Sequence, residues 1–90
     1  MHDVYLTRKA QKELKKMDRS DRDRILDAID DLQNDAFPPG SKRLRGNPVD
    51  DTDRSFWRLR VGDYRVIYTT EDDHLVVLVV RVRHRKDAYR

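Results

Sequence analysis

The fold is decided by residues 57–68, which read WRLRVGDYRVIY. In each half of this stretch two kinds of side chain alternate, a period of two that is typical of β-strands with one buried face. Gly62-Asp63 separates the halves, and such a pair indicates a two-residue hairpin turn because glycine readily adopts a positive φ. The stretch therefore predicts two antiparallel strands joined by a tight turn.

A third strand is expected on the C-terminal side of this hairpin. Residues 75–82 are nearly all apolar, which predicts a central strand covered on both faces. Glu71-Asp72-Asp73 lies between the hairpin and this strand and is expected to form the connecting turn. The three strands would then form an antiparallel meander.

On the N-terminal side, we expect a short strand at Asp3 to Leu6 and then two amphipathic helices. Thr7 is expected to cap the first helix, which runs through about Lys16, and Ser20 to cap the second. Pro38-Pro39-Gly40 ends helical structure. The apolar positions are Ala10, Leu14 and Met17 in the first helix and Ile25, Ile29 and Leu32 in the second, broadened by Leu26 and Ala28.

The order of elements predicts a single α+β domain over residues 1–90, with the N-terminal strand and the helical hairpin packed on a mainly antiparallel sheet. Residues 38–54 are expected to form a polar loop. The sheet face toward the helices is expected to carry Trp57, Leu59, Tyr64, Val66 and Tyr68. The opposite face is expected to carry Phe56, Arg58, Arg60, Arg65 and Ile67. Because helices cover only one side, its arginines are expected to stay exposed to water.

Charge is distributed unevenly along the chain. The 90 residues carry 20 Lys plus Arg against 17 Asp plus Glu, a net charge of +3. Residues 1–40 hold 8 basic and 9 acidic side chains, whereas residues 41–90 hold 12 basic and 8 acidic, and ten of those 12 are arginine. Arginine presents a planar fork of donors that suits bidentate contact with phosphate. The second half therefore fits a phosphate-binding surface, and the alternative is the ordinary solvated surface of a small basic protein.

Composition and motifs exclude several classes of protein. No apolar run approaches the ~18–20 residues that span a bilayer, and the first residues do not read as a signal peptide. The absence of cysteine excludes a disulfide framework and a thiolate metal site. His2, His74 and His84 lack the spacing of metal ligands, and no glycine-rich phosphate motif is present, so we expect no metal and no cofactor. The expected compartment is the cytoplasm, with no membrane partner.

An arginine-rich site fits the cleavage of RNA without a metal. This reaction needs a 2′-hydroxyl in line with the phosphorus, stabilisation of charge on the phosphoryl oxygens, and proton transfer to and from oxygen. Arginines can supply the second requirement, and Tyr89 offers a ring on which a base can stack. His84 suits the third because its ordinary pKa is near ~6.5, although a histidine in a basic tail is more often a plain surface residue.

Three stretches together carry a family resemblance, namely Leu44-Arg45-Gly46, residues 57–68, and residues 75–85, which read LVVLVVRVRHR. They resemble the RelE/ParE superfamily of type II toxins. The resemblance implies a RelE-like α+β fold similar to microbial ribonucleases. RelE-like members cut mRNA in the ribosomal A site without metal, through 2′-hydroxyl attack that leaves a 2′,3′-cyclic phosphate and stops translation. An acidic RelB-like antitoxin neutralises them, and operator DNA is bound only through the toxin–antitoxin complex.

The resemblance also implies roles for individual residues. Arg65 matches a phosphate-binding arginine, Arg85 matches an arginine that acts on transition-state charge or the leaving group, and Tyr89 approximates a tyrosine that stacks on the substrate. Arg58 stands where the best-known member has a lysine proposed as general base, and arginine, with a pKa above ~12, is a poor base. His84 is therefore our candidate for the acid–base group. The remaining candidates for RNA and phosphate binding are Lys42, Arg43, Arg45, Arg60 and Arg83.

Two other functions stay open from the sequence. ParE-like proteins share the fold but inhibit DNA gyrase and are not nucleases, and the missing lysine at Arg58 keeps this alternative in view. The other alternative is a non-catalytic RNA-binding module, such as a decayed toxin. The arginine pattern favours the ribonuclease, because a gyrase inhibitor has no evident use for Arg65, Arg85 and Tyr89 as a set.

Overall fold

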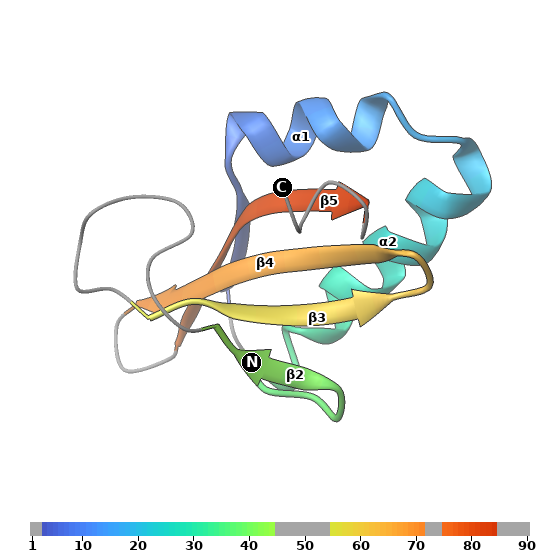
Figure 1. Cartoon of the computed structure of the whole chain (residues 1–90). Helices are drawn as coiled ribbons and strands as arrows, with labels where there is room; N and C mark the ends of the chain where they lie inside the picture. The colour runs from blue at the N-terminus through green and yellow to red at the C-terminus, as the bar shows by residue number, and fades with distance from the viewer. Residues whose placement is uncertain (1–2, 45–54, 72–74, 85–90) are drawn as a thin grey trace.

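The computed structural model describes residues 3–44, 55–71 and 75–84 and contains two helices and one five-stranded sheet (Figure 1). The elements are β1 (Asp3–Leu6), α1 (Arg8–Lys15), α2 (Arg19–Asp31), β2 (Ser41–Arg43), β3 (Trp57–Val61), β4 (Tyr64–Glu71) and β5 (Val76–His84). The strand order is β1-β5-β4-β3-β2, in which β1 runs parallel to β5 and every other pair is antiparallel. The predicted α+β architecture is confirmed.

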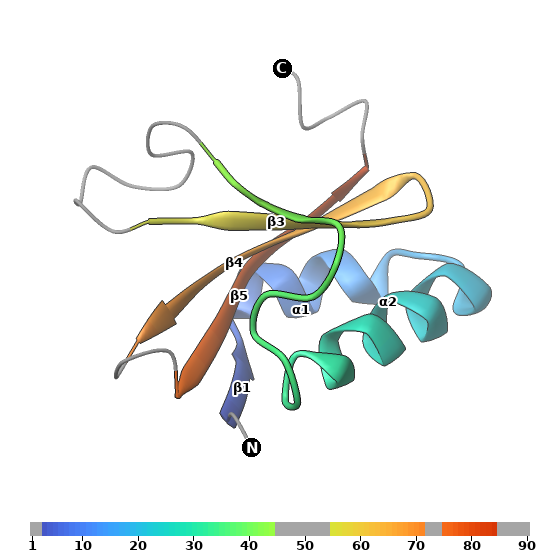
Figure 2. The same cartoon turned by 90° about the horizontal axis from the view of Figure 1, so that it is seen from below.

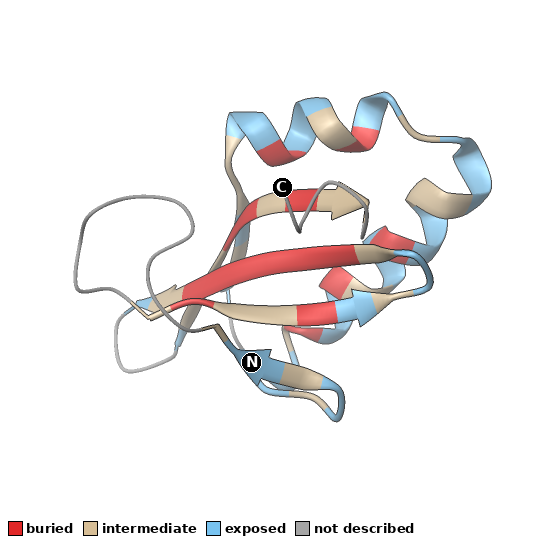
Figure 3. Ribbon diagram, in the orientation of Figure 1, coloured by how far each residue is buried: buried red, intermediate tan, exposed pale blue. Residues whose placement is uncertain are grey.

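Both helices cover the same face of the sheet (Figure 2). Their apolar stripes pack there against Leu59, Val66 and Tyr68, as predicted, and against three valines of β5. Trp57 and Tyr64 are half-buried at the margin of this core. Figure 3 shows that buried residues run along most of β4, the middle strand of the sheet. No helix in the described ranges is long and apolar enough to span a bilayer.

The helix starts follow the sequence in one case and depart from it in the other. Thr7 is the N-cap of α1, and its Oγ1 accepts a hydrogen bond from the backbone N of Ala10 at 3.2 Å, as predicted. In α2 the N-cap is Asp18, so the prediction of a Ser20 cap is wrong. The helix starts two residues earlier than predicted because the amide of Arg22 already donates to the carbonyl of Asp18, at 2.9 Å.

Four further sequence predictions need correction. Leu26 is exposed and does not broaden the core stripe. Ser41–Arg43, predicted as loop, is strand β2, which continues the sheet beside β3. Three residues are too few to show a period, so this strand is recognised only through its pairing. Glu71, predicted in a turn, is the last residue of β4, and β5 extends past residue 82 to His84.

The sheet has a second, smaller apolar cluster on the face away from the helices. Phe56, Ile67 and Val80 are its buried members, with Leu44 and Leu78 packed against them. The register between β4 and β5 shifts between Ile67 and Tyr68, where Val80 is the extra residue, so Val80 and the following Arg81 both lie on the side of Ile67 while Val79 and Val82 face the main core. β5 therefore lies inside the sheet and is apolar on both faces, as the sequence predicts.

Candidate functional site

Basic side chains gather on the sheet face that the helices leave uncovered. The register pairs Arg60 with Arg65, and Arg65 with Arg83, so three arginines form one row across β3, β4 and β5. The adjacent row pairs Lys42 with Arg58. Directly paired residues of antiparallel strands project to the same side, and the intervening Leu59, Val66 and Val82 belong to the helix-side core. We call Lys42, Arg58, Arg60, Arg65 and Arg83 the basic face.

The members of the basic face differ in exposure. Lys42 and Arg60 are exposed, Arg58 and Arg83 are half-buried, and Arg65 is only 8% exposed. The prediction that all these arginines stay in water is therefore wrong for Arg65. Its position on the middle strand explains the difference, because the long side chains of its two cross-strand neighbours flank it within about 5 Å at Cβ. Arg65 is therefore the most buried residue of the row, and Arg60 and Arg83 flank it on the neighbouring strands.

The row brings three like charges onto neighbouring strands. Like charges placed directly opposite each other on neighbouring strands are destabilising, and this row places three cations side by side. A phosphate group that lies among them can accept charge-assisted hydrogen bonds, to which arginine is well suited. Guanidinium groups arranged in this way can contact the oxygens of a phosphate group.

His84 lies on the other face of the sheet from the basic face. It pairs with Tyr64, and the two rings meet edge to face with centroids 5.2 Å apart. Both line a pocket of about 170 Å³ together with Asp21 and Arg24 of α2. Burial, and then the nearby Asp21 carboxylate, raise the pKa of the Tyr64 hydroxyl. The structure therefore does not bring the predicted acid–base residue together with Arg58 and Arg65.

The remaining predicted residues fall into two groups. Arg43 lies on β2 beside the basic face, and its guanidinium donates to Ser55 Oγ at 2.8 Å. Arg45, Arg85 and Tyr89 lie outside the described residues. In the part of the chain that the structure describes, no group of three or more histidine or acidic side chains could hold a metal ion.

One contact of the site region is missing from the sequence-based picture. Glu13 of α1 binds Arg81 of β5 through two hydrogen bonds of 3.1 and 3.0 Å. The sequence could have indicated this ion pair, because Glu13 is the single carboxylate in the helical stretch between Thr7 and Met17, which is otherwise rich in lysine. Arg81 is therefore engaged by a carboxylate of the protein itself.

Comparison with known proteins gives a consistent family. Residues 4–89 match the ParE toxin family of type II toxin–antitoxin systems, parDE. The RelE–RelB complex from Pyrococcus horikoshii OT3 aligns over 93% of this chain and 94% of the matched chain, with a TM-score of 0.76 and 25% identity. The toxin–antitoxin complex RelBE2 from Mycobacterium tuberculosis aligns over 93% and 98%, with a TM-score of 0.75 and 26% identity.

A curated relative agrees over a shorter stretch. Toxin RelG from Mycobacterium tuberculosis is 48% identical over 31 residues, which is 34% of this chain and 36% of the relative. The chain thus aligns with about a third of that relative's length by sequence, whereas the family match and the structural matches span nearly all of the chain. The chain belongs to the ParE toxin family and is a type II toxin of the RelE/ParE superfamily.

Proposed function

We propose that this toxin is a metal-independent endoribonuclease that inhibits translation by cutting mRNA in the ribosomal A site. The observation that carries the proposal is the row of Arg60, Arg65 and Arg83 on the uncovered sheet face. Three guanidinium groups in register present donors to the phosphodiester backbone, and the exposed Arg60 and half-buried Arg83 at the ends of the row leave it open to RNA. The toxin would act in the cytoplasm, without a cofactor.

The chemistry assigned to the basic face is charge stabilisation. Arg58 and Arg65 would hold the scissile phosphate, and fixed cations aimed at the phosphoryl oxygens stabilise the charge that develops as the 2′-hydroxyl attacks. The cleaved strand then ends in a 2′,3′-cyclic phosphate, and the departing 5′-oxygen takes up a proton. Arg85 and Tyr89 are proposed as the group next to the leaving oxygen and the base-stacking ring. The rRNA of the A site completes the substrate surface.

His84 is expected to contribute little to cleavage. Its ring packs on Tyr64 on the helix-side face, so it cannot transfer a proton to a phosphate bound on the basic face without leaving that contact. We expect His84→Gln to retain cleavage within about tenfold of the wild type, since a positioned acid–base group contributes ~10²–10⁴-fold. The measurement is mRNA cleavage on purified ribosomes programmed with a defined message. A loss of a hundredfold or more would return the acid–base role to His84.

An anion that occupies the basic face should stabilise the fold. A ligand at about 100 times its Kd adds about 2.7 kcal/mol to the free energy of unfolding, which corresponds to a rise of several degrees in Tm. The probe is a single-stranded 2′-O-methyl RNA, which the toxin cannot cleave by 2′-hydroxyl attack, followed by thermal unfolding. Arg83→Met should lose most of the rise, and Arg19→Met, which removes an exposed arginine of α2, should keep it. An equal rise in both variants would place the RNA elsewhere.

A cognate acidic RelB-like antitoxin is the proposed protein partner. Relatives of the same fold are solved as RelE–RelB and RelBE2 complexes. A basic face that accepts RNA also attracts an acidic chain, so the antitoxin would cover the basic face or compete for it. Operator DNA would be bound only by the toxin–antitoxin complex. Expression of the toxin with and without the neighbouring antitoxin gene tests the partner directly, because only the toxin alone should arrest growth.

The second candidate is inhibition of DNA gyrase, and one observation favours it. The family that matches residues 4–89 is described as the ParE toxin of parDE systems. Arg58, in place of a lysine base, is compatible with this function as well. Mapping of mRNA ends after induction separates the two candidates. Discrete cuts within codons support the ribonuclease, whereas intact mRNA with an SOS response supports the gyrase inhibitor.

A further inference from the structure

The outer edge of β5 changes its neighbour halfway along the strand. β1 pairs with β5 only as far as Leu6, which lies opposite Val79. Thr7 then closes the pairing, because its amide donates to the carbonyl of Val79 and its hydroxyl to the carbonyl of Val80, each at 2.9 Å. Beyond this point β1 has left the sheet, and the chain has turned into α1.

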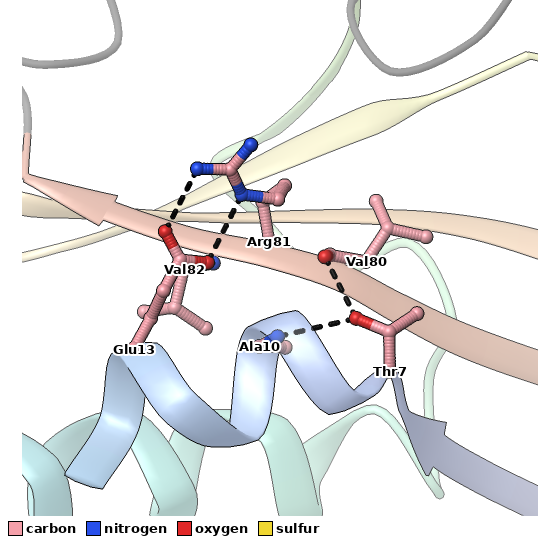
Figure 4. A network of polar contacts seen from close by, with 6 residues as sticks. All are labelled: Thr7, Ala10, Glu13, Val80, Arg81 and Val82. Atoms are coloured by element: carbon pink, nitrogen blue, oxygen red, sulfur yellow. Dashed lines mark hydrogen bonds and ion pairs between the residues drawn. The ribbon is translucent and has the colours of Figure 1, made fainter.

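Glu13 takes the place of the missing strand. Its Oε1 accepts a hydrogen bond from the backbone N of Val82 at 2.9 Å and one from Arg81 Nε at 3.1 Å, while Oε2 accepts from Arg81 Nη2 at 3.0 Å. Figure 4 shows Glu13 reaching from α1 to the strand and Arg81 turning its guanidinium toward it. Both side chains of the pair are 22% exposed, so the contact is partly shielded from water.

Arg81 is positioned to join the basic face but is held away from it. The register pairs Arg81 with Ile67, which is also the partner of Arg58, so Arg81 starts on the same side of the sheet as Arg58. Its guanidinium is engaged by both carboxylate oxygens of Glu13, an arrangement that is stronger than a single neutral hydrogen bond. A phosphate at Arg81 would have to displace this carboxylate or lie beside it, and the two negative charges would repel.

We propose that Glu13 is a positioning residue that fixes where RNA lies on the basic face. It withholds Arg81 from phosphate and anchors the C-terminal end of β5, so the RNA backbone is held by Arg58 and by the row of Arg60, Arg65 and Arg83, and does not extend to Arg81. This proposal rests on the proposed function, because it concerns how the same face holds RNA. Glu13 itself does not touch the substrate.

Glu13→Gln separates this role from simple structural support. The amide oxygen of Gln can still accept from Val82, but the charge that holds Arg81 is gone. Released Arg81 would add one phosphate contact, so the slope of log binding constant against log salt should steepen by up to about 0.7 for single-stranded RNA. The probe is a fluorescent 2′-O-methyl RNA, read by anisotropy over a range of salt concentrations. On ribosomes, kcat for cleavage should fall while KM does not rise.

Two variants serve as controls. Asp23→Asn makes the same change in net charge, but its partner Arg19 is a loose, exposed neighbour on α2 with 3.9 Å between Nε and Oδ2. The salt slope of Asp23→Asn should equal that of the wild type, because this remote change in charge adds no new phosphate contact. Arg81→Met should also leave the salt slope at the wild-type value, because Arg81 does not contact phosphate while Glu13 binds it.

The outcomes decide between the proposals. A Glu13→Gln slope that matches the Asp23→Asn slope, or an Arg81→Met slope shallower than wild type, would overturn the role of Glu13. If Glu13→Gln fails to fold, the Arg81→Met slope alone decides, since an unchanged slope supports the withheld arginine and a shallower one refutes it. If wild-type toxin shows no salt-dependent RNA binding at all, the proposed function fails before the role of Glu13 is reached.

Discussion

Arg65→Met is expected to abolish growth arrest and to lower mRNA cleavage by at least about 100-fold, because the loss of one fixed donor at a developing charge typically costs ~10²–10³ in rate. Arg65 lies at the centre of the arginine row and is the least exposed of the three. A buried cation is surrounded by less water, so its field at the phosphate is less screened than that of Arg60. Cleavage on programmed ribosomes and growth after induction measure the effect.

The substitution is chosen so that the fold survives. Methionine keeps most of the aliphatic stem of Arg65 and packs adaptably, so the variant should fold. Arg19→Met, on the exposed surface of α2, is the matched control and should retain full activity. Wild-type cleavage by a folded Arg65→Met protein would refute the assignment of the scissile phosphate to Arg65.

Tyr68→Ala is expected to leave the toxin largely unfolded at 37 °C. Tyr68 is fully buried, its ring stacks on Trp57 with centroids 6.3 Å apart, and its hydroxyl donates to the carbonyl of Ala36 at 2.8 Å. Truncation of a buried aromatic residue costs about 3–5 kcal/mol, and small domains have only about 5–15 kcal/mol in total. Urea denaturation followed by far-UV circular dichroism measures the loss.

Tyr68→Phe isolates the hydroxyl and adds a dependence on pH. The variant should lose about 1–3 kcal/mol, since the buried carbonyl of Ala36 loses its donor. Burial raises the pKa of Tyr68 above its ordinary value of 10.0. The neutral hydroxyl is therefore favoured in the folded state, and this contribution is complete below the unfolded pKa and is lost as pH rises through the folded pKa. The difference in stability between wild type and Tyr68→Phe should thus be constant near neutral pH and shrink above pH 10. A difference that grows there would contradict the burial of the neutral group.

The elements that the sequence predicts correctly are those with local causes. Gly62 at the hairpin has a φ of 58°, as the turn requires, and a Cβ there would lie 3.1 Å from Nη1 of Arg24. Thr7 caps α1 through a bond to an amide three residues away. Strand β2 and the parallel pairing of β1 with β5 depend on residues far apart in the chain, so no local pattern could reveal them.

In the candidate site as well, the features that depend on local sequence were predicted, and the burial that depends on other strands was not. Alternation along β3 and β4 correctly places Arg58, Arg60 and Arg65 on one face, because facing is a local property of a strand. The burial of Arg65 was missed because it depends on neighbours contributed by two other strands. The facing of His84 could have been predicted, since it stands two residues after buried Val82 on the same strand and therefore projects to the same side.

The parallel pairing of β1 with β5 has a consequence for how the toxin is made. Asp3 pairs with Val76 and Leu6 with Val79, so β1 cannot form its strand pairing until β5 has also left the ribosome. The helices wait as well, because three valines of β5 complete the surface on which they pack. Such long-range pairing delays folding until most of the chain is available. A nascent toxin thus lacks Arg83, the end of its arginine row, while β5 is still inside the ribosome. The codons of β5 are therefore translated before the complete basic face can form.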